Sequence, residues 1–335
     1  MDAFIIILLI VTFILAFGIG ANDETMAPVV GSHSLKLKTA VIAGGILSFF
    51  GCYFLARNVG KTIGRNLLGS TVEYSSLMML SIILSTTIWL IVASKTGAPI
   101  STTHSVVGSI FGISLVWSIT TTGTFLESMN WSKMGSVVLG WFISPLFGMF
   151  GAILLQLLMN KILKKTNTSL LKIEKTEKIF IYALVASVLW TQVSRGGNDA
   201  ANAIGVFYGL LNTNDIVEPA LPLLLAITGI MMALGLIFVG RNVIKSVGGG
   251  LVEMRPSDAF VISLSTTLVI FVCTILGLPI SGSHVLVFAI IGSGFVKGNR
   301  PDKKSFRKMV LSWFLTFPVA ALLCAVFYVI LLGIF

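Results

Sequence analysis

Two stretches of this sequence decide its fold: Pro99-Ile100-Ser101-Thr102-Thr103-His104, and Pro279-Ile280-Ser281-Gly282-Ser283-His284, which lies 180 positions later. They lie within the longer segments 81–112 and 261–292, in which 14 of 32 paired positions are identical without gaps. About three identities are expected by chance from this composition. Upstream, Asn22-Asp23 matches Asn198-Asp199 at a slightly shorter offset. The chain is therefore built from two copies of one unit.

The composition places both copies in a membrane. Of 335 residues, 56% are hydrophobic and only 11% are charged, with a mean hydropathy of +0.98. A soluble domain carries about 25% charged residues. The net charge of +10 comes from basic residues in short gaps between apolar runs, which excludes a nucleic-acid reader. The three cysteines lie inside apolar runs, which indicates core residues rather than disulfides or metal ligands. We expect an all-α polytopic protein of the cell membrane.

Uncharged runs near the roughly 20 residues of a membrane-spanning helix indicate where the spans lie. Two of them, Thr96–Leu126 and Ala259–Val296, contain the Pro-Ile-Ser motifs, so we expect spans joined to broken or re-entrant helices. No basic residue precedes the first run, so no signal peptide is expected and this run should remain as a span. The other predicted spans are Ala3–Asn22, Thr39–Ala56, Tyr74–Ser94, Gly135–Asn160, Ile179–Ser194, Pro219–Gly240 and Met309–Phe335.

Matched loops of the two copies differ in charge. Asn160–Lys178 and Lys297–Lys308 each hold six Lys or Arg residues, so the positive-inside rule predicts that both are cytoplasmic. Thr120–Lys133, the counterpart of Lys297–Lys308, holds only one. Equivalent loops then lie on opposite faces, which predicts two inverted-topology repeats with both chain ends outside. We divide the chain into a first repeat (1–160), a cytoplasmic basic linker (161–178) and a second repeat (179–335).

Inverted repeats with broken helices are typical of secondary transporters, which hold their substrate near the midplane where the copies meet. Channels can share this symmetry, so a passive anion channel is an alternative; it would not need coupling carboxylates. An intramembrane enzyme is not expected, because no Asp-x-x-Asp or His-Glu-x-x-His spacing occurs. We expect no cofactor beyond a coupling ion.

The repeated Asn–Asp pairs are the candidate cation ligands. A carboxylate at membrane depth costs on the order of 3 kcal/mol, so it persists where it pairs, binds an ion or relays a proton. Asp23 and Asp199, beside Asn22 and Asn198, offer the oxygen ligands that a hard cation such as Na⁺ takes, in a turn loosened by glycine. The alternative is that each aspartate caps a helix at the membrane boundary. Glu24 has no acidic counterpart in the second copy and receives no role.

The Pro-Ile-Ser segments are the candidate anion site. Proline favours the first turn of a helix, and a half-helix N-terminus offers hydroxyls, free N–H groups and a partial positive charge. Alternatively, the hydroxyls only bond helix carbonyls. Arg195 could pair with Asp199, contact the anion or extend to the cytoplasmic face. The predicted anion ligands are Ser101, Thr102, Thr103, Ser281, Ser283 and Arg195, with His104 and His284 as either anion donors or structural histidines.

These motifs resemble those of the inorganic phosphate transporter (PiT) family. Gly20-Ala21-Asn22-Asp23 and the segment from Gly197 to Ala203 are similar to its duplicated Gly-Ala-Asn-Asp-x-Ala-Asn signature. The resemblance implies a Na⁺- or H⁺-coupled symporter of inorganic phosphate in the lipid bilayer, with Na⁺ favoured and with Asn202 among the cation ligands. It also leaves sulfate as an alternative substrate and a homodimer as an open question.

Two departures from the family pattern affect the predicted coupling. Met26 stands in the first signature where the family has its second Asn. Ser194-Arg195-Gly196-Gly197 stands before Asn198 in place of the usual Ser-His-Gly-Ala. Both changes leave the coupling ion and its stoichiometry open.

Overall fold

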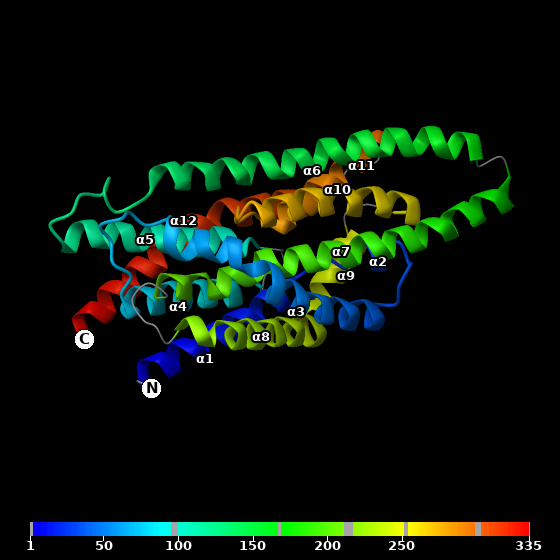
Figure 1. Ribbon diagram of the computed structural model, residues 1–335. Coiled ribbons are helices and arrows are strands. Elements are labelled where there is room, and N and C mark those ends of the chain that lie inside the picture. Colours follow the sequence, from blue (N-terminus) through cyan, green and yellow to red (C-terminus); the bar gives the residue numbers. More distant parts are fainter. Residues whose placement is uncertain are drawn as a thin grey trace.

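The protein is almost entirely helical in the computed structural model, which describes residues 3–94, 100–166, 169–210, 217–250, 254–298 and 303–334. Within these residues, 7 helices are long and apolar enough to cross a membrane, and three shorter apolar helices accompany them. The helices run roughly along one common axis (Figure 1). The prediction of an all-α multi-pass membrane protein is confirmed.

The helices follow one another with short connections. The first half contains α1 (Ala3–Ala21), α2 (Ala27–Gly31), α3 (Leu37–Lys61) with the π-helical turn Thr62–Asn66, α4 (Ser76–Ser94), α5 (Thr102–Thr120) and α6 (Trp131–Thr166). The second half contains α7 (Leu170–Leu210), α8 (Val217–Gly235) with the π-helical turn Leu236–Gly240, α9 (Arg241–Gly250), α10 (Pro256–Ile275), α11 (Gly282–Val296) and α12 (Lys303–Ile334).

Two helical hairpins enter the molecule from opposite ends. Figure 1 shows α4 and α5 in the left half of the view and α10 and α11 in the right half. Both chain ends lie on the left, and the end of α6 and the start of α7 lie on the right. The predicted linker 161–178 is mostly helical, because α6 continues to Thr166 and α7 begins at Leu170. Its basic residues therefore extend two helices instead of forming a loop.

The turn of the second hairpin is attached to α3. Between α10 and α11 the chain turns at Gly277, whose φ of +68° is a conformation that glycine adopts without strain. Thr62 Oγ1 donates a hydrogen bond of 2.6 Å to the Gly277 carbonyl, and Asn58 Nδ2 donates one of 3.1 Å to the Ile275 carbonyl. The first half thereby holds the hairpin of the second. In the first hairpin, the corresponding Pro99 lies outside the described residues.

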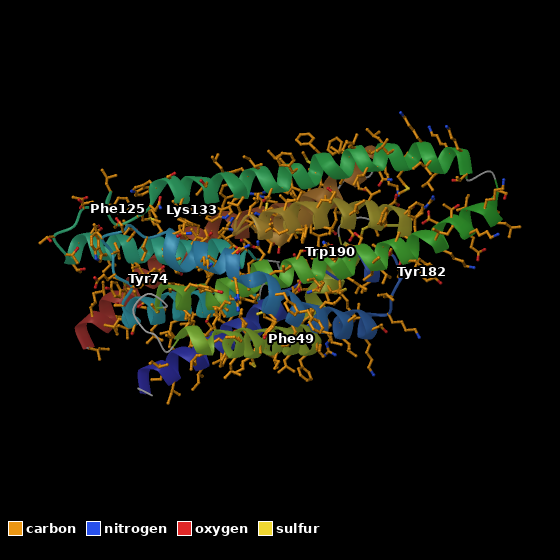
Figure 2. The ribbon with its side chains drawn as sticks, viewed as in Figure 1. Phe49, Tyr74, Phe125, Lys133, Tyr182 and Trp190 are labelled. Atoms are coloured by element: carbon orange, nitrogen blue, oxygen red, sulfur yellow. The ribbon has the colours of Figure 1, made fainter. Side chains whose placement is uncertain are left out.

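The surface is apolar, unlike that of a soluble protein, and the interior combines apolar core clusters with buried polar side chains. Large apolar side chains such as Phe54 and Phe147 are 65% exposed, and Phe314 is 68% exposed. Figure 2 shows Tyr182 and Trp190 projecting outward from α7. An apolar surface of this extent is stable against lipid chains rather than water. The interior, by contrast, contains buried charged side chains, and a cluster of them defines the candidate site.

Candidate functional site

The two half-helices begin at equivalent serines with nearly identical backbones. Ser101 precedes α5 with φ −88° and ψ 107°, and Ser281 precedes α11 with φ −92° and ψ 106°. Each hydroxyl oxygen accepts a hydrogen bond from the backbone N–H three residues on, at 3.2 Å from His104 and 3.4 Å from His284. Both serines are therefore N-caps, and the predicted starts of these half-helices are confirmed.

The tips of the two hairpins meet inside the protein. Thr103 Oγ1, from the first tip, donates a hydrogen bond of 3.0 Å to the carbonyl of Ile280 in the second tip. Asn202 Nδ2 on α7 donates to Thr103 Oγ1 at 3.3 Å. The structure therefore brings residues of both predicted anion-binding segments into direct contact.

Each signature asparagine holds the tip of its own half. Asn22 Nδ2 donates to the Ile100 carbonyl at 3.0 Å, and Asn198 Nδ2 donates to the Leu278 carbonyl at 3.1 Å. Asn198 Oδ1 also accepts the N–H of Ile280 at 3.3 Å. Each asparagine therefore links a predicted cation-binding signature to a predicted anion-binding hairpin tip. A cation and an anion bound at these two places would be neighbours.

Asp23 lies in a break between α1 and α2. Its Oδ1 accepts hydrogen bonds from the backbone N–H (2.9 Å) and the hydroxyl (2.6 Å) of Thr25, and its Oδ2 accepts one from Gln192 Nε2 at 2.5 Å. Pro28 explains the break, since it occupies the first turn of α2 and would disrupt a helix that continued from α1. The expectation of a non-helical turn at this aspartate is confirmed.

Asp199 lies inside a continuous helix, contrary to the prediction that a span closes in a loosened turn there. The helix α7 runs on to Leu210. The glycines before Asn198 serve close helix packing with α3. A Cβ atom on the facing Gly51 would lie 2.1 Å from the Val193 carbonyl oxygen, so the two backbones are in contact. These glycines permit that contact without interrupting the helix.

One guanidinium joins the acidic residues of both halves. Arg195 Nε donates to Asp199 Oδ2 at 2.8 Å, and Nη1 donates to Glu24 Oε1 at 2.7 Å and lies 3.6 Å from Asp23 Oδ1. Every side chain in these pairs is at most 9% exposed. Of the alternatives for Arg195, the structure shows pairing with Asp199, and its burial excludes extension to the surface.

The sequence did not assign a role to two members of this network. Glu24 is fully buried and paired with Arg195, although its lack of a counterpart gave it no role. Gln192 donates to Asp23 and, at 2.6 Å, to Ser48 Oγ. The signal that could have found both was a polar or charged side chain in apolar sequence surroundings: Glu24 follows an apolar span directly, and Gln192 lies inside one. With the three carboxylates ionised, the network has a formal charge of −3 + 1 = −2.

Several buried oxygen atoms of the described residues, on the network and on the signature asparagines, accept no hydrogen bond. Among the described residues, no hydrogen-bond donor reaches the buried atoms Asn22 Oδ1, Glu24 Oε2, Gln192 Oε1 and Asn202 Oδ1. Hard cations are bound by carboxylate and amide oxygens of this kind. The described part of the chain contains no cluster of three His, Cys, Asp or Glu side chains placed to hold a metal ion, so a cation here would need amide ligands as well.

The same guanidinium also contacts the second hairpin tip. Arg195 Nη2 donates a hydrogen bond of 3.1 Å to Ser283 Oγ. A Cβ atom at Gly282 would lie 2.8 Å from Arg195 Nε, so the missing side chain allows the close approach. In the first tip Thr102 occupies the corresponding position. The site is therefore asymmetric, with Arg195 on the tip of the second half.

The two histidines lie on a different face of the tips. Their rings are 4.8 Å apart, and they pack against tryptophans of α6 and α12: His104 on Trp141 at 4.0 Å and His284 on Trp313 at 3.9 Å between ring centroids. They border an apolar cavity of about 550 Å³ lined by α6 and α12. The structure does not bring them into the Arg195 network, and their contact with an anion stays a prediction.

Comparisons with known proteins agree on one family. The family model described as "Phosphate transporter family" matches residues 19–324. A Pyrococcus abyssi protein named "Putative phosphate permease" is 30% identical, with 99% of this chain and 98% of that protein covered. The Arabidopsis thaliana "Inorganic phosphate transporter 2-1, chloroplastic" is 26% identical over 94% of this chain and 70% of its own length. A solved structure described as "The sodium-dependent phosphate transporter" is 25% identical with a TM-score of 0.86, covering 100% of both chains.

Proposed function

Because this chain belongs to the phosphate transporter family, we propose that it is a secondary transporter that carries inorganic phosphate together with Na⁺. Phosphate transport follows from the family; coupling to Na⁺ is the finer part of the proposal. It is supported by the similarity to a solved transporter that is described as sodium-dependent and by the oxygen-rich centre of this protein.

The observation that carries the proposal is that three buried carboxylates face a single positive charge. Asp23, Glu24 and Asp199 share one guanidinium. An uncompensated charge inside a protein costs several kcal/mol, and the lipid around this one offers no relief. Binding of a cation lowers this cost directly. A phosphate anion then approaches a centre that the cation has made less negative, which explains why the two ions would travel together.

The hairpin tips supply what a phosphate anion requires. Two facing half-helix N-termini provide backbone N–H groups and favourable dipoles, and their serines and threonines add hydroxyl donors. We assign phosphate binding to Ser101, Thr102, Thr103, Ser281 and Ser283, with Arg195 adjoining Ser283. The cation ligands in this proposal are Asn22, Asp23, Asn198, Asp199 and Asn202.

Uptake into proteoliposomes tests the proposal. The purified protein is reconstituted, and entry of labelled phosphate is measured with an inward Na⁺ gradient, with an inward H⁺ gradient, or with neither. We expect concentrative uptake only with Na⁺, and competition by unlabelled phosphate but not by sulfate. Uptake driven equally well by H⁺ alone would contradict Na⁺ coupling. Equal flux without any gradient would indicate a passive channel, and stronger competition by sulfate would change the substrate.

A further inference from the structure

The two charged residues that break the internal repeat contact each other. By the alignment of the Asn–Asp pairs, Glu24 corresponds to Ala200 and Arg195 corresponds to Ile19. Each copy thus contributes one unmatched charge to the centre. The two side chains form a buried salt bridge, with Arg195 Nη1 2.7 Å from Glu24 Oε1, although they are 171 positions apart in the sequence. Such a pair is neutral in total, so it leaves the charge of the two repeated aspartates unchanged.

Arg195 also connects the two kinds of site. Its Nε and Nη1 atoms lie beside the aspartates that we assign to the cation, and its Nη2 atom lies on Ser283, which we assign to phosphate. A guanidinium has five N–H donors in a fixed plane, so a donor released by one partner stays close to the others. Arg195 is therefore in contact with both proposed sites, and a change at one site can alter its hydrogen bonds at the other.

We propose that Arg195 couples the two ions by exchanging partners. Without Na⁺, the guanidinium donates to Asp199 and lies beside Asp23. When Na⁺ binds to these aspartates, it competes with Arg195, whose released donors then bind phosphate at the Ser283 tip while Glu24 keeps the guanidinium in place. Phosphate therefore binds tightly only when Na⁺ is present. This inference rests on the proposed function and adds the mechanism of coupling.

The exchange predicts a reciprocal effect on affinity. If Na⁺ strengthens phosphate binding by a certain factor, phosphate strengthens Na⁺ binding by the same factor. Couplings between sites are typically about 5- to 150-fold. We expect the phosphate dissociation constant of the unmodified protein to fall by roughly tenfold or more between Na⁺-free and Na⁺-saturated conditions. Equilibrium binding of labelled phosphate to the purified protein measures this factor without requiring transport.

A double substitution isolates the contribution of the asymmetric pair. Glu24→Ala combined with Arg195→Ile replaces each residue by the one at the matched position of the other copy. The double substitution removes one negative and one positive charge, so the net charge of the centre is unchanged. We expect this variant to fold and still to bind Na⁺, but the Na⁺-dependent change in phosphate affinity should fall by about fivefold or more. Arg195→Lys is the second variant: it retains the charge, but one ammonium cannot contact Asp199, Glu24 and Ser283 together. Its coupling should also decrease.

Lys178→Gln serves as the matched control. Lys178 lies on the same helix as Arg195, but its salt bridge to Glu174 is exposed. It should leave the coupling factor unchanged. The proposal is overturned if the double variant and Arg195→Lys both keep the coupling factor of the unmodified protein. If the unmodified protein binds phosphate with no response to Na⁺, Na⁺ coupling itself is wrong, and that result is distinct from a failure of the Arg195 exchange.

Discussion

The two copies of the Asn–Asp signature share these two residues but have different backbones. In the first copy α1 ends at Ala21, and Asp23 lies in a non-helical turn before α2. In the second copy Asp199 lies within the unbroken helix α7. The residues that follow each pair explain the difference. Pro28 requires a new helix in the first copy, whereas the second continues with alanines, which favour a helix.

The difference also changes how each carboxylate is held. Asp23 accepts hydrogen bonds from the local turn, through Thr25, and from Gln192 on α7. Asp199 is bound by Arg195 one turn earlier on the same helix. A duplicated motif therefore does not produce two identical sites. Substitutions at matched positions of the two copies can reveal which contacts serve ion binding and which serve structure.

The largest effect is expected when either carboxylate is neutralised. Asp23→Asn and Asp199→Asn each remove a charge from the centre and leave Arg195 with fewer charged partners. An interaction with a charged group contributes about 1.5–3 kcal/mol, so the loss of a carboxylate that we assign to Na⁺ should reduce Na⁺-driven phosphate uptake on the order of 100-fold. The measurement is uptake into proteoliposomes as a function of Na⁺ concentration.

The control for these variants is Glu174→Gln, an exposed carboxylate on α7. It should transport as the unmodified protein does. Membrane insertion and the thermal unfolding of each variant show whether lost uptake reflects lost folding. If both aspartate variants fold and retain the parent rate and Na⁺ dependence, the carboxylates have a structural role only and the cation lies elsewhere.

Local chemistry made several features of the fold predictable from the sequence. The apolar runs identified the spans, because a helix in lipid must satisfy its own backbone and present apolar side chains outward. The half-helices begin at Ser101 and Ser281, as the proline and hydroxyl pattern predicts. The break at Asp23 was also expected. Each of these features depends on residues close together in the chain.

The repeat predicted that the two Pro-Ile-Ser segments meet, but other contacts between distant residues were not predicted. Glu24 was left without a role because its partner Arg195 lies in the other half. Gly196 and Gly197 suggested a loosened turn, but they lie against the backbone of α3, and α7 continues through them. A glycine permits either a turn or close packing, and only the neighbouring helix decides between them. The roles of the site residues stay predictions.

The next largest effect is expected at the two N-cap serines. Each hydroxyl caps a half-helix, so Ser101→Ala or Ser281→Ala should reduce stability by about 0.5–2 kcal/mol. If the hydroxyls also donate to phosphate, each loss should weaken its affinity by roughly ten- to a hundredfold, which corresponds to about 1.5–3 kcal/mol. Because the two caps have nearly the same geometry, we expect similar effects in both variants.

Two measurements separate the roles of these serines. Thermal unfolding reports the cap, and the phosphate concentration that gives half-maximal uptake reports the ligand. Ser118→Ala, at a half-buried position of α5, is the control, since its hydroxyl donates to the Leu115 carbonyl of the same helix. Reduced stability with unchanged half-maximal concentrations in both variants would mean that the serines are caps alone.

The smallest effect is expected at Thr25, the residue that gives the first copy its local turn. Thr25→Ala removes the hydroxyl bond to Asp23 Oδ1, but the backbone N–H of residue 25 and Gln192 still hold the carboxylate. One hydrogen bond contributes about 1 kcal/mol, so the Na⁺ concentration for half-maximal uptake should rise roughly fivefold. Ala201, at the matched position of the second copy, has no hydroxyl to lose, so this substitution makes the two signatures more alike.

Thr121→Ala, whose exposed hydroxyl bonds the Trp117 carbonyl, is the control. A rise on the order of a hundredfold, about 3 kcal/mol, would make the Thr25 hydroxyl a direct Na⁺ ligand, whereas no change in either affinity or stability would show that the turn does not hold Asp23.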